Sequence, residues 1–271
     1  MFFSLSTYIP TPLAFSIRGF AVHWYGLILV IAIVAGYGIA GWLARRQRIE
    51  KSLIQTIYVN TLIWGIVGAR LYHVLNEPAF YWNNPSQIPA VWNGGLAIHG
   101  ALVAGALCLY YYARKHQFSF YQLADLFVLP AILGQAIGRW GNYFNQELFG
   151  APSNLPWAIP IEPVYRPYGY EQFSHFHPTF LYESAFNLLV FILLLFVFRK
   201  KQRPQGLVLW LYVGIYSVGR IMTEALRVDR TPIIGGIRLP LMVSIALAVV
   251  GIGMAVNIGS KKQETGRKQA T

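Results

Sequence analysis

The sequence predicts an all-α, polytopic membrane protein with about seven transmembrane helices. Of its 271 residues, 55% are hydrophobic and only 12% are charged, which is too apolar for an ordinary soluble domain. Seven apolar-rich stretches, each about 18 to 22 residues long, have the length that a helix needs to cross a bilayer. Basic residues gather in alternate loops between these stretches, which is typical of membrane proteins with a fixed orientation.

The predicted spans follow one another without an internal repeat, so nothing indicates a transporter built from inverted halves. They cover residues 22–43, 53–75, 94–113, 118–137, 178–198, 205–222 and 239–258. The first three and the last three are apolar runs of sufficient length. The fourth is the least typical, because Asp125, Pro130 and Gln135 are tolerated in a membrane only where they face the protein interior. Glu183, inside the fifth span, likewise needs a buried partner.

The basic loops predict the orientation of these spans. The segments "ARRQRIEK", "RKH" and "RKKQR" follow the first, third and fifth spans, and "KKQETGRKQ" follows the last, so all four lie on one side. Cytoplasmic loops hold the excess of Lys and Arg, which predicts an outside N-terminus and a cytoplasmic C-terminus. We expect one integral membrane domain over residues 1–260 and a basic cytoplasmic tail over 261–271.

Two further segments are expected on the outer side. The first 20 residues lack the features of a cleaved signal peptide and are expected to stay at the membrane interface. The segments 76–93 and 139–177, rich in Trp, Tyr, Pro and Asn, are expected to form a small outer cap.

Several classes of chemistry are disfavoured. Cys108 is the single cysteine, so no internal disulfide can form, and no Cys/His cluster suggests a metal. There are only two aspartates, Asp125 and Asp229, and no paired carboxylates at ligand spacing, which disfavours a two-metal phosphoryl transferase. No phosphate-binding loop or dinucleotide fingerprint occurs, so no cofactor is expected. The high pI reflects the basic loops and the arginines, and nothing points to a nucleic-acid partner.

The basic residues are also sorted by type. All seven lysines lie in the inner loops, together with seven arginines, whereas the eight basic residues outside those loops are all arginine. These are Arg18, Arg70, Arg139, Arg166, Arg220, Arg227, Arg230 and Arg238. A guanidinium fork suits bidentate binding of a carboxylate or a phosphate, and phosphate is abundant at a lipid surface. We interpret Arg139 and Arg220, at the outer ends of spans, as functional, and Arg70 has a similar position. Snorkelling or pairing with acids is the alternative, favoured for Arg18, Arg166, Arg230 and Arg238 taken singly.

The sixth span ends in "GRIMTEALRVD", which spaces Arg220, Glu224 and Arg227 by four and three residues. These side chains share a helix face if the helix continues that far, and Glu224 could then hold both arginines. A self-contained surface ion pair is the alternative interpretation.

The densest polar stretch is "GRWGNYFNQELFG", residues 138–150, at the outer end of the fourth span. Its glycines disfavour a plain helix, so we expect a bent, partly re-entrant backbone that lines a polar cavity. Asn142, Asn145 and Gln146 would supply amides, Arg139 a phosphate clamp, and Glu147 a carboxylate that orients the arginine or takes a proton. The alternative is a polar loop satisfied by water.

Two aromatic residues have open roles. His99, five residues into the third span, can be a general base or a neutral, hydrogen-bonding core residue. Tyr25 follows His23 and Trp24, and its position alone favours an interfacial aromatic belt over a site residue.

Together these motifs resemble those of the bacterial prolipoprotein diacylglyceryl transferases. The segments "GAR", "GGLAIHG", "GRWGNYFNQELFG", "HPTFLYE" and "GRIMTEALR" are similar to that family's motifs, in the same order and over nearly the whole chain. The resemblance implies transfer of the diacylglyceryl group of phosphatidylglycerol to the lipobox cysteine of prolipoprotein signal peptides, with release of glycerol 1-phosphate. It also implies a bacterial inner membrane, a periplasmic site and cap, and membrane lipids as partners.

The resemblance also assigns site residues. Arg139 and Arg220 would bind the headgroup phosphate, Asn142, Glu147 and Gly150 would shape that site, and Tyr25 and His99 would flank the reacting carbon. Arg70, Asn145 and Glu224 complete the expected substrate-binding set. We expect His99, or Glu147 acting through Arg220 or water, to assist thiol deprotonation, because the thiolate is the nucleophile. Both substrates reside in the bilayer, so we expect lateral openings between helices. A lipid or organic-anion transporter, or another lipid-phosphate transferase, is the competing interpretation.

Overall fold

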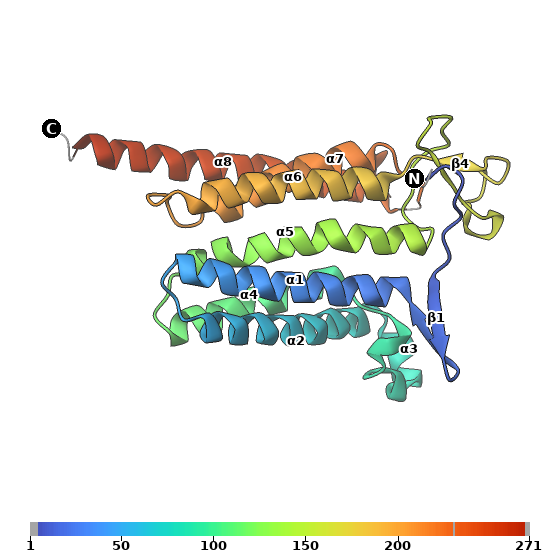
Figure 1. The fold of residues 1–271 in the computed structure, drawn as a ribbon, viewed down its shortest axis with the longest axis horizontal. Coiled ribbons are helices and arrows are strands. Elements are labelled where there is room, and N and C mark those ends of the chain that lie inside the picture. Colours follow the sequence, from blue (N-terminus) through green and yellow to red (C-terminus); the bar gives the residue numbers. More distant parts are fainter. Residues whose placement is uncertain (1–4, 230, 269–271) are drawn as a thin grey trace. The chain divides into compact units, whose positions relative to one another are not determined.

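The computed structural model describes residues 5–229 and 231–268 as two compact units (Figure 1). The first unit contains Met1–Gly36 and Val128–Thr271, and the second contains Tyr37–Phe127. Arg230 and the end of the predicted basic tail, 269–271, lie outside the described residues.

The predicted all-α class is confirmed, since the described residues form eight α-helices and only short β-ribbons. The helices are α1 (Trp24–Arg46), α2 (Lys51–Asn76), α3 (Pro78–Asn83), α4 (Ile98–Lys115), α5 (Phe120–Phe144), α6 (Thr179–Arg199), α7 (Leu207–Glu224) and α8 (Leu239–Lys268). Every helix except α3 overlaps one of the seven predicted spans. Five helices, α1, α2, α5, α6 and α8, are long and apolar enough to cross a membrane. The chain is thus a multi-pass membrane protein, and the count of seven spans stays a prediction, because α4 and α7 are not among these five helices.

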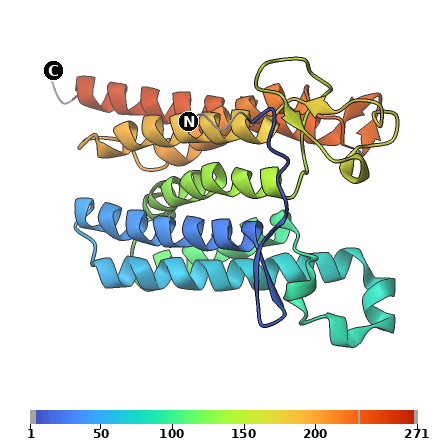
Figure 2. The same ribbon diagram turned by 45° about the vertical axis from the view of Figure 1, so that its right-hand side comes forward.

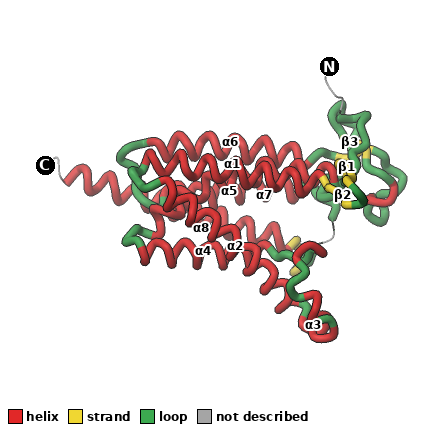
Figure 3. The backbone as a smooth tube through the Cα atoms, turned by 60° about the horizontal axis from the view of Figure 1, so that its bottom comes forward, coloured by secondary structure: helices red, strands yellow, loops and turns green. Residues whose placement is uncertain are grey.

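In the second unit, α2 and α4 pack closely along each other because glycines face glycines. A Cβ atom at Gly68 or at Gly100 would overlap the backbone of the other helix. Ala97 N donates to Ala69 O (3.1 Å) where α4 begins. Helix α3 and two 3₁₀ turns, η1 (Pro85–Gln87) and η2 (Val91–Asn93), form an arm that projects beyond the end of α2 (Figures 2 and 3). This arm contains the predicted cap segment 76–93.

In the first unit, α6, α7 and α8 lie side by side (Figure 1). A Cβ atom at Gly214 of α7 would lie 2.9 Å from Ile252 Cγ1, so this glycine permits the close approach of α8. The polar residues of the fourth span are accommodated as predicted. Asp125, which belongs to the second unit, is fully buried, and in the first unit Gln135 Nε2 donates to Tyr212 Oη (2.8 Å) on α7.

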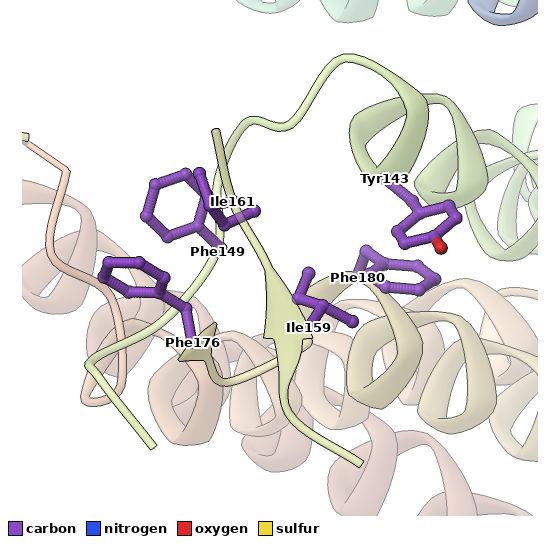
Figure 4. Close-up of a cluster of buried hydrophobic side chains, with 6 residues drawn as sticks. All are labelled: Tyr143, Phe149, Ile159, Ile161, Phe176 and Phe180. Carbon is purple, nitrogen blue, oxygen red and sulfur yellow. The ribbon is translucent and has the colours of Figure 1, made fainter. Parts of the chain in front are cut away.

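The segment between α5 and α6, residues 145–177, forms a cap with its own apolar core. Strands β3 (Ile159–Pro160) and β4 (His175–Phe176) pair antiparallel, and a 3₁₀ turn, η3 (Pro163–Tyr165), lies between them. The core consists of Tyr143, Phe149, Ile159, Ile161, Phe176 and Phe180, each no more than 6% exposed (Figure 4). Because this cluster includes α5 and α6 residues, the cap is fixed to the ends of both helices.

Two β-hairpins complete the first unit. Strands β1 (Leu13–Ile17) and β2 (Phe20–His23) are joined by Arg18 and Gly19, both at positive φ, as two-residue hairpin turns require. Strands β5 (Ile233–Ile234) and β6 (Ile237–Arg238) are joined through Gly235 and Gly236 in the same way. Residues 13–20 of the expected interfacial segment therefore belong to a hairpin, and their Phe15, Ile17 and Phe20 side chains are exposed.

Candidate active site

The centre of the candidate site is Glu183, one turn into α6. Its carboxylate is buried and contacts three arginines from three different segments. Arg139 Nη2 of α5 lies 2.6 Å from Oε2, and Arg220 Nη1 of α7 lies 3.2 Å from the same oxygen. Arg227 Nη2, just after α7, lies 3.0 Å from Oε1. The sequence predicted that Glu183 needs a buried partner, and the structure gives it three arginine partners.

Glu224 forms the second half of the network. Its Oε2 lies 3.3 Å from Arg220 Nη2, so the predicted pair four residues apart on α7 is confirmed. Its Oε1 lies 2.9 Å from Arg238 Nε, and Arg238 Nη2 lies 3.6 Å from Asp229 Oδ1. The expectation that Glu224 also holds Arg227 is wrong. Helix α7 ends at Glu224, so the chain turns there and directs Arg227 to Glu183 instead.

We call Arg139, Arg220, Arg227 and Arg238, with Glu183, Glu224 and Asp229, the arginine cluster. Four cations and three anions leave it with one net positive charge. Burial lowers the pKa of the Arg227 guanidinium from its ordinary value, and the Glu183 carboxylate opposes this shift. The Arg227 side chain is 7% exposed, whereas those of Arg139 and Arg220 are each 18% exposed. The surplus charge is therefore accessible on Arg139 and Arg220, and also on Arg238, whose side chain is 23% exposed.

The backbone of the stretch 138–150 differs from the expectation. Helix α5 continues unbroken through Gly138 and Gly141 to Phe144. The predicted bent, re-entrant backbone is therefore wrong for residues 138–144. A helical glycine costs only about 0.5–1 kcal/mol relative to alanine, which tertiary packing readily offsets. The turn comes later, at Gln146 (φ 52°) and Leu148 (φ 57°).

The polar side chains of this stretch form a chain of hydrogen bonds from Arg139 to Glu147. Arg139 Nη1 donates to Asn142 Oδ1 (3.3 Å), and Asn142 Nδ2 donates to Glu147 Oε1 (2.7 Å). Asn145 Nδ2 also donates to Glu147 Oε1 (3.4 Å). Glu147 is exposed, so it reaches Arg139 through Asn142 and remains accessible for proton transfer. Gln146 instead has a structural position, since its amide joins Pro10 O (2.8 Å) to Glu162 N (2.7 Å).

Tyr25 and Gly150 both lie beside this stretch. Tyr25, in the first turn of α1, packs its ring edge on α5 at Gly141, where a Cβ atom would lie 2.5 Å from Cδ2. Gly150 N donates to His177 O (2.9 Å), and a Cβ atom there would lie 3.0 Å from Leu226 O. Gly150 therefore permits the cap backbone to pass next to the segment that carries Arg227.

Arg70 and His99 belong to the second unit. Arg70 is buried and donates to Ile88 O (2.8 Å), Gly94 O (2.6 Å), Gly95 O (3.0 Å) and Gln87 O, so it fixes the loop that leads into α4. His99 is the second residue of α4, which begins at Ile98, so the predicted depth of five residues into the helix is wrong. Its ring is exposed and lies 5.7 Å from the Tyr72 ring, which argues against a core histidine.

The site residues predicted from the sequence omit four members of the arginine cluster: Glu183, Arg227, Asp229 and Arg238. Glu183 had a usable signal, because an acid inside an apolar span requires a cation. Arg238 was assigned to pairing with acids, which is confirmed, but its partner Glu224 is distant in sequence. Only the fold of β5 and β6 brings the two together.

The chain is similar in sequence to known proteins over most of its length. The family model for prolipoprotein diacylglyceryl transferase matches residues 12–257. Phosphatidylglycerol–prolipoprotein diacylglyceryl transferases from Synechocystis sp. and Synechococcus elongatus are 40% and 42% identical, over 89% and 90% of this chain and 87% and 86% of their own lengths. The transferase of the same name from Gloeobacter violaceus is 41% identical over 96% of both chains. The chain therefore belongs to the prolipoprotein diacylglyceryl transferase family.

Proposed function

We propose that this protein transfers the diacylglyceryl group of phosphatidylglycerol to the lipobox cysteine of prolipoproteins and releases glycerol 1-phosphate. The cysteine sulfur forms a thioether bond to the terminal glycerol carbon of the diacylglyceryl group. The carbon–oxygen bond to phosphate breaks, its electron pair leaves with glycerol 1-phosphate, and the thiol proton passes to a base. The chain supplies no nucleophile of its own for this step, because the substrate thiol is the nucleophile.

The observation that carries the proposal is the arginine cluster with its net positive charge. A phosphodiester carries one negative charge, and a second develops on the leaving phosphate as the bond breaks. Donors that are already in place where this charge develops lower the barrier without reorganisation. Arg139 and Arg220 suit this role, because both are accessible and both are held in position by buried carboxylates.

The remaining site residues receive roles that fit their contacts. Asn142 and Glu147 orient Arg139, Asn145 supports Glu147, and Glu224 orients Arg220. Gly150 keeps the cap close to Arg227, and Tyr25 borders the site from α1. Arg70 shapes the loop before α4. The thiol proton is taken by His99 or by Glu147, both of which are exposed ionisable groups.

We further propose seven membrane spans, with the N-terminus and the cap on the periplasmic side of the inner membrane. The basic residues support this orientation within each unit. Arg45, Arg46, Arg114 and Lys115 lie in the last turns of α1 and α4, and Arg199 lies in the last turn of α6. Within the first unit, the arginine cluster lies at the opposite end of α6 from Arg199, because Glu183 is near the start of that helix. Since lipid and signal peptide are both confined to the bilayer, substrates would enter laterally between helices.

The test uses purified protein, phosphatidylglycerol and a synthetic lipobox peptide, with Arg139→Ala as the control. We expect a diacylglyceryl mass gain on the peptide, equimolar release of glycerol 1-phosphate, and loss of both in the variant. Lipid movement between vesicle leaflets without a peptide mass gain would instead support transport and refute the transferase proposal. Hydrolysis of the lipid without thioether formation would indicate a different lipid-phosphate enzyme.

A further inference from the structure

We propose that Glu183 is a positioning residue for the transfer, which binds no substrate and aligns Arg139 and Arg220 as one phosphate-binding array. The inference rests on the proposed function and concerns a residue that the sequence motifs did not assign to the site. Glu183 touches three of the four arginines in the arginine cluster, more than any other described acid does.

The geometry favours alignment over direct contact with substrate. The Glu183 side chain is 5% exposed, and both of its oxygens are already occupied by guanidinium nitrogens. A carboxylate beside the lipid phosphate would also repel it, unless cations lie between the two groups. Arg139 and Arg220 are those cations, and each uses a second nitrogen on another partner, Asn142 or Glu224.

Glu183 also joins cations that come from different segments of the chain. Arg139 lies near the end of α5, Arg220 lies near the end of α7, and Arg227 lies in the connection after it. These three cations repel one another, since like charges at close range are mutually destabilising. A neutral side chain at position 183 would leave that repulsion uncompensated. The arginines would then separate, and the phosphate site would lose its shape.

The experiment compares Glu183→Gln with the wild-type enzyme by steady-state kinetics. We expect kcat/KM for phosphatidylglycerol to fall about 10- to 100-fold, as for loss of a charge-assisted hydrogen-bond partner. The KM for the lipid should rise, whereas the KM for the lipobox peptide should stay unchanged. A purely structural defect gives a different result, because a smaller folded fraction lowers apparent kcat and alters neither KM.

A double-mutant cycle with Arg139→Lys tests whether Glu183 acts through the arginines. If it does, Glu183→Gln should cost less in the Arg139→Lys background than in the wild type, because residues in contact are not additive. Multiplicative losses would overturn the inference. Glu171→Gln is the matched control, since the carboxylate of that exposed cap glutamate accepts from Gly169 N (2.8 Å) and makes no hydrogen bond or ion pair with the described residues of the arginine cluster, and the variant should retain full activity.

Glu183→Asp keeps the inference testable if the glutamine variant fails to fold. It preserves the charge but shortens the side chain by one methylene, so it cannot reach all three arginines at once. We expect it to fold and still to raise the KM for the lipid. Wild-type kinetics in either variant would overturn the role of Glu183, whereas an inactive wild-type enzyme would instead overturn the proposed function.

Discussion

Replacing Gly141 by alanine should disturb the candidate site without breaking its helix. Alanine is the better helix former by about 1 kcal/mol, so in an open position this change would stabilise α5. The added Cβ atom would, however, lie 2.5 Å from Tyr25 Cδ2, 2.9 Å from Cε2 and 3.1 Å from Cγ. Ordinary contacts are about 3.4–4 Å, so the ring must move by about 1 Å.

The size of the effect follows from how freely that ring can move. Overpacking costs about 1–3 kcal/mol in a packed interior. Tyr25 is 41% exposed, so its ring can be displaced and the cost should fall near the lower limit. The better helix propensity of alanine offsets about 1 kcal/mol of this cost, so we expect the variant to be less stable than the wild type by about 0–2 kcal/mol. The change in activity should be larger, because a 1 Å displacement of a positioning group can cost about 100-fold.

Gly138 offers a matched control on the same helix. No atom lies within 4 Å of a Cβ built at Gly138, in the part of the chain that the structure describes. Gly138→Ala should therefore stabilise the protein by about 0.5–1 kcal/mol and keep its activity. The assay is thermal unfolding in detergent, together with peptide lipidation. If Gly141→Ala matched Gly138→Ala in both measurements, the proposed packing of Tyr25 on α5 and its role in the site would be refuted.

Three further changes test other parts of the site. Gly150→Ala should lower thermal stability by about 1–3 kcal/mol, since its Cβ would press on Leu226 O and His177; unchanged unfolding would contradict the close approach of cap and Arg227. Arg139→Lys should lower kcat/KM at least about tenfold, because one ammonium cannot bind Glu183 and Asn142 with two separate nitrogens. Full lipidation activity in this variant would show that the two-nitrogen geometry of Arg139 is not needed. His99→Gln should abolish most turnover at pH 7, and near-normal turnover there would transfer the role of base to Glu147.

The helical part of the fold could be predicted because length and apolar content decide it locally. Seven stretches were expected and seven long helices overlap them. The path of the chain at 138–150 could not be read in the same way, because glycine lowers helix propensity wherever it occurs. Gly141 makes room for the Tyr25 ring. These two residues are more than a hundred positions apart, so the sequence around Gly141 cannot predict their contact.

In the charged network, too, the contacts within one helix could be predicted from the sequence, whereas the contacts between helices could not. Arg220 and Glu224 were paired correctly, since four residues on one helix fix their proximity. Arg227 was assigned to Glu224 by extending that helix by one turn, whereas the helix ends and Arg227 reaches Glu183 on α6. Spacing predicts partners only within one element. Partners on different helices require the packing of those helices.

The preference for arginine outside the lysine-rich loops now has a structural explanation. Arg139 and Arg220 each place two nitrogens on two different partners, and Arg166 does the same with the carbonyls of Ile161 and Glu171. Arg70 binds several backbone carbonyls at once, and Arg238 joins Glu224 to Asp229. A lysine has a single nitrogen and cannot bridge separated acceptors in this fixed geometry. Most of these arginines therefore join pieces of the protein, and we propose phosphate binding as a further task of Arg139 and Arg220.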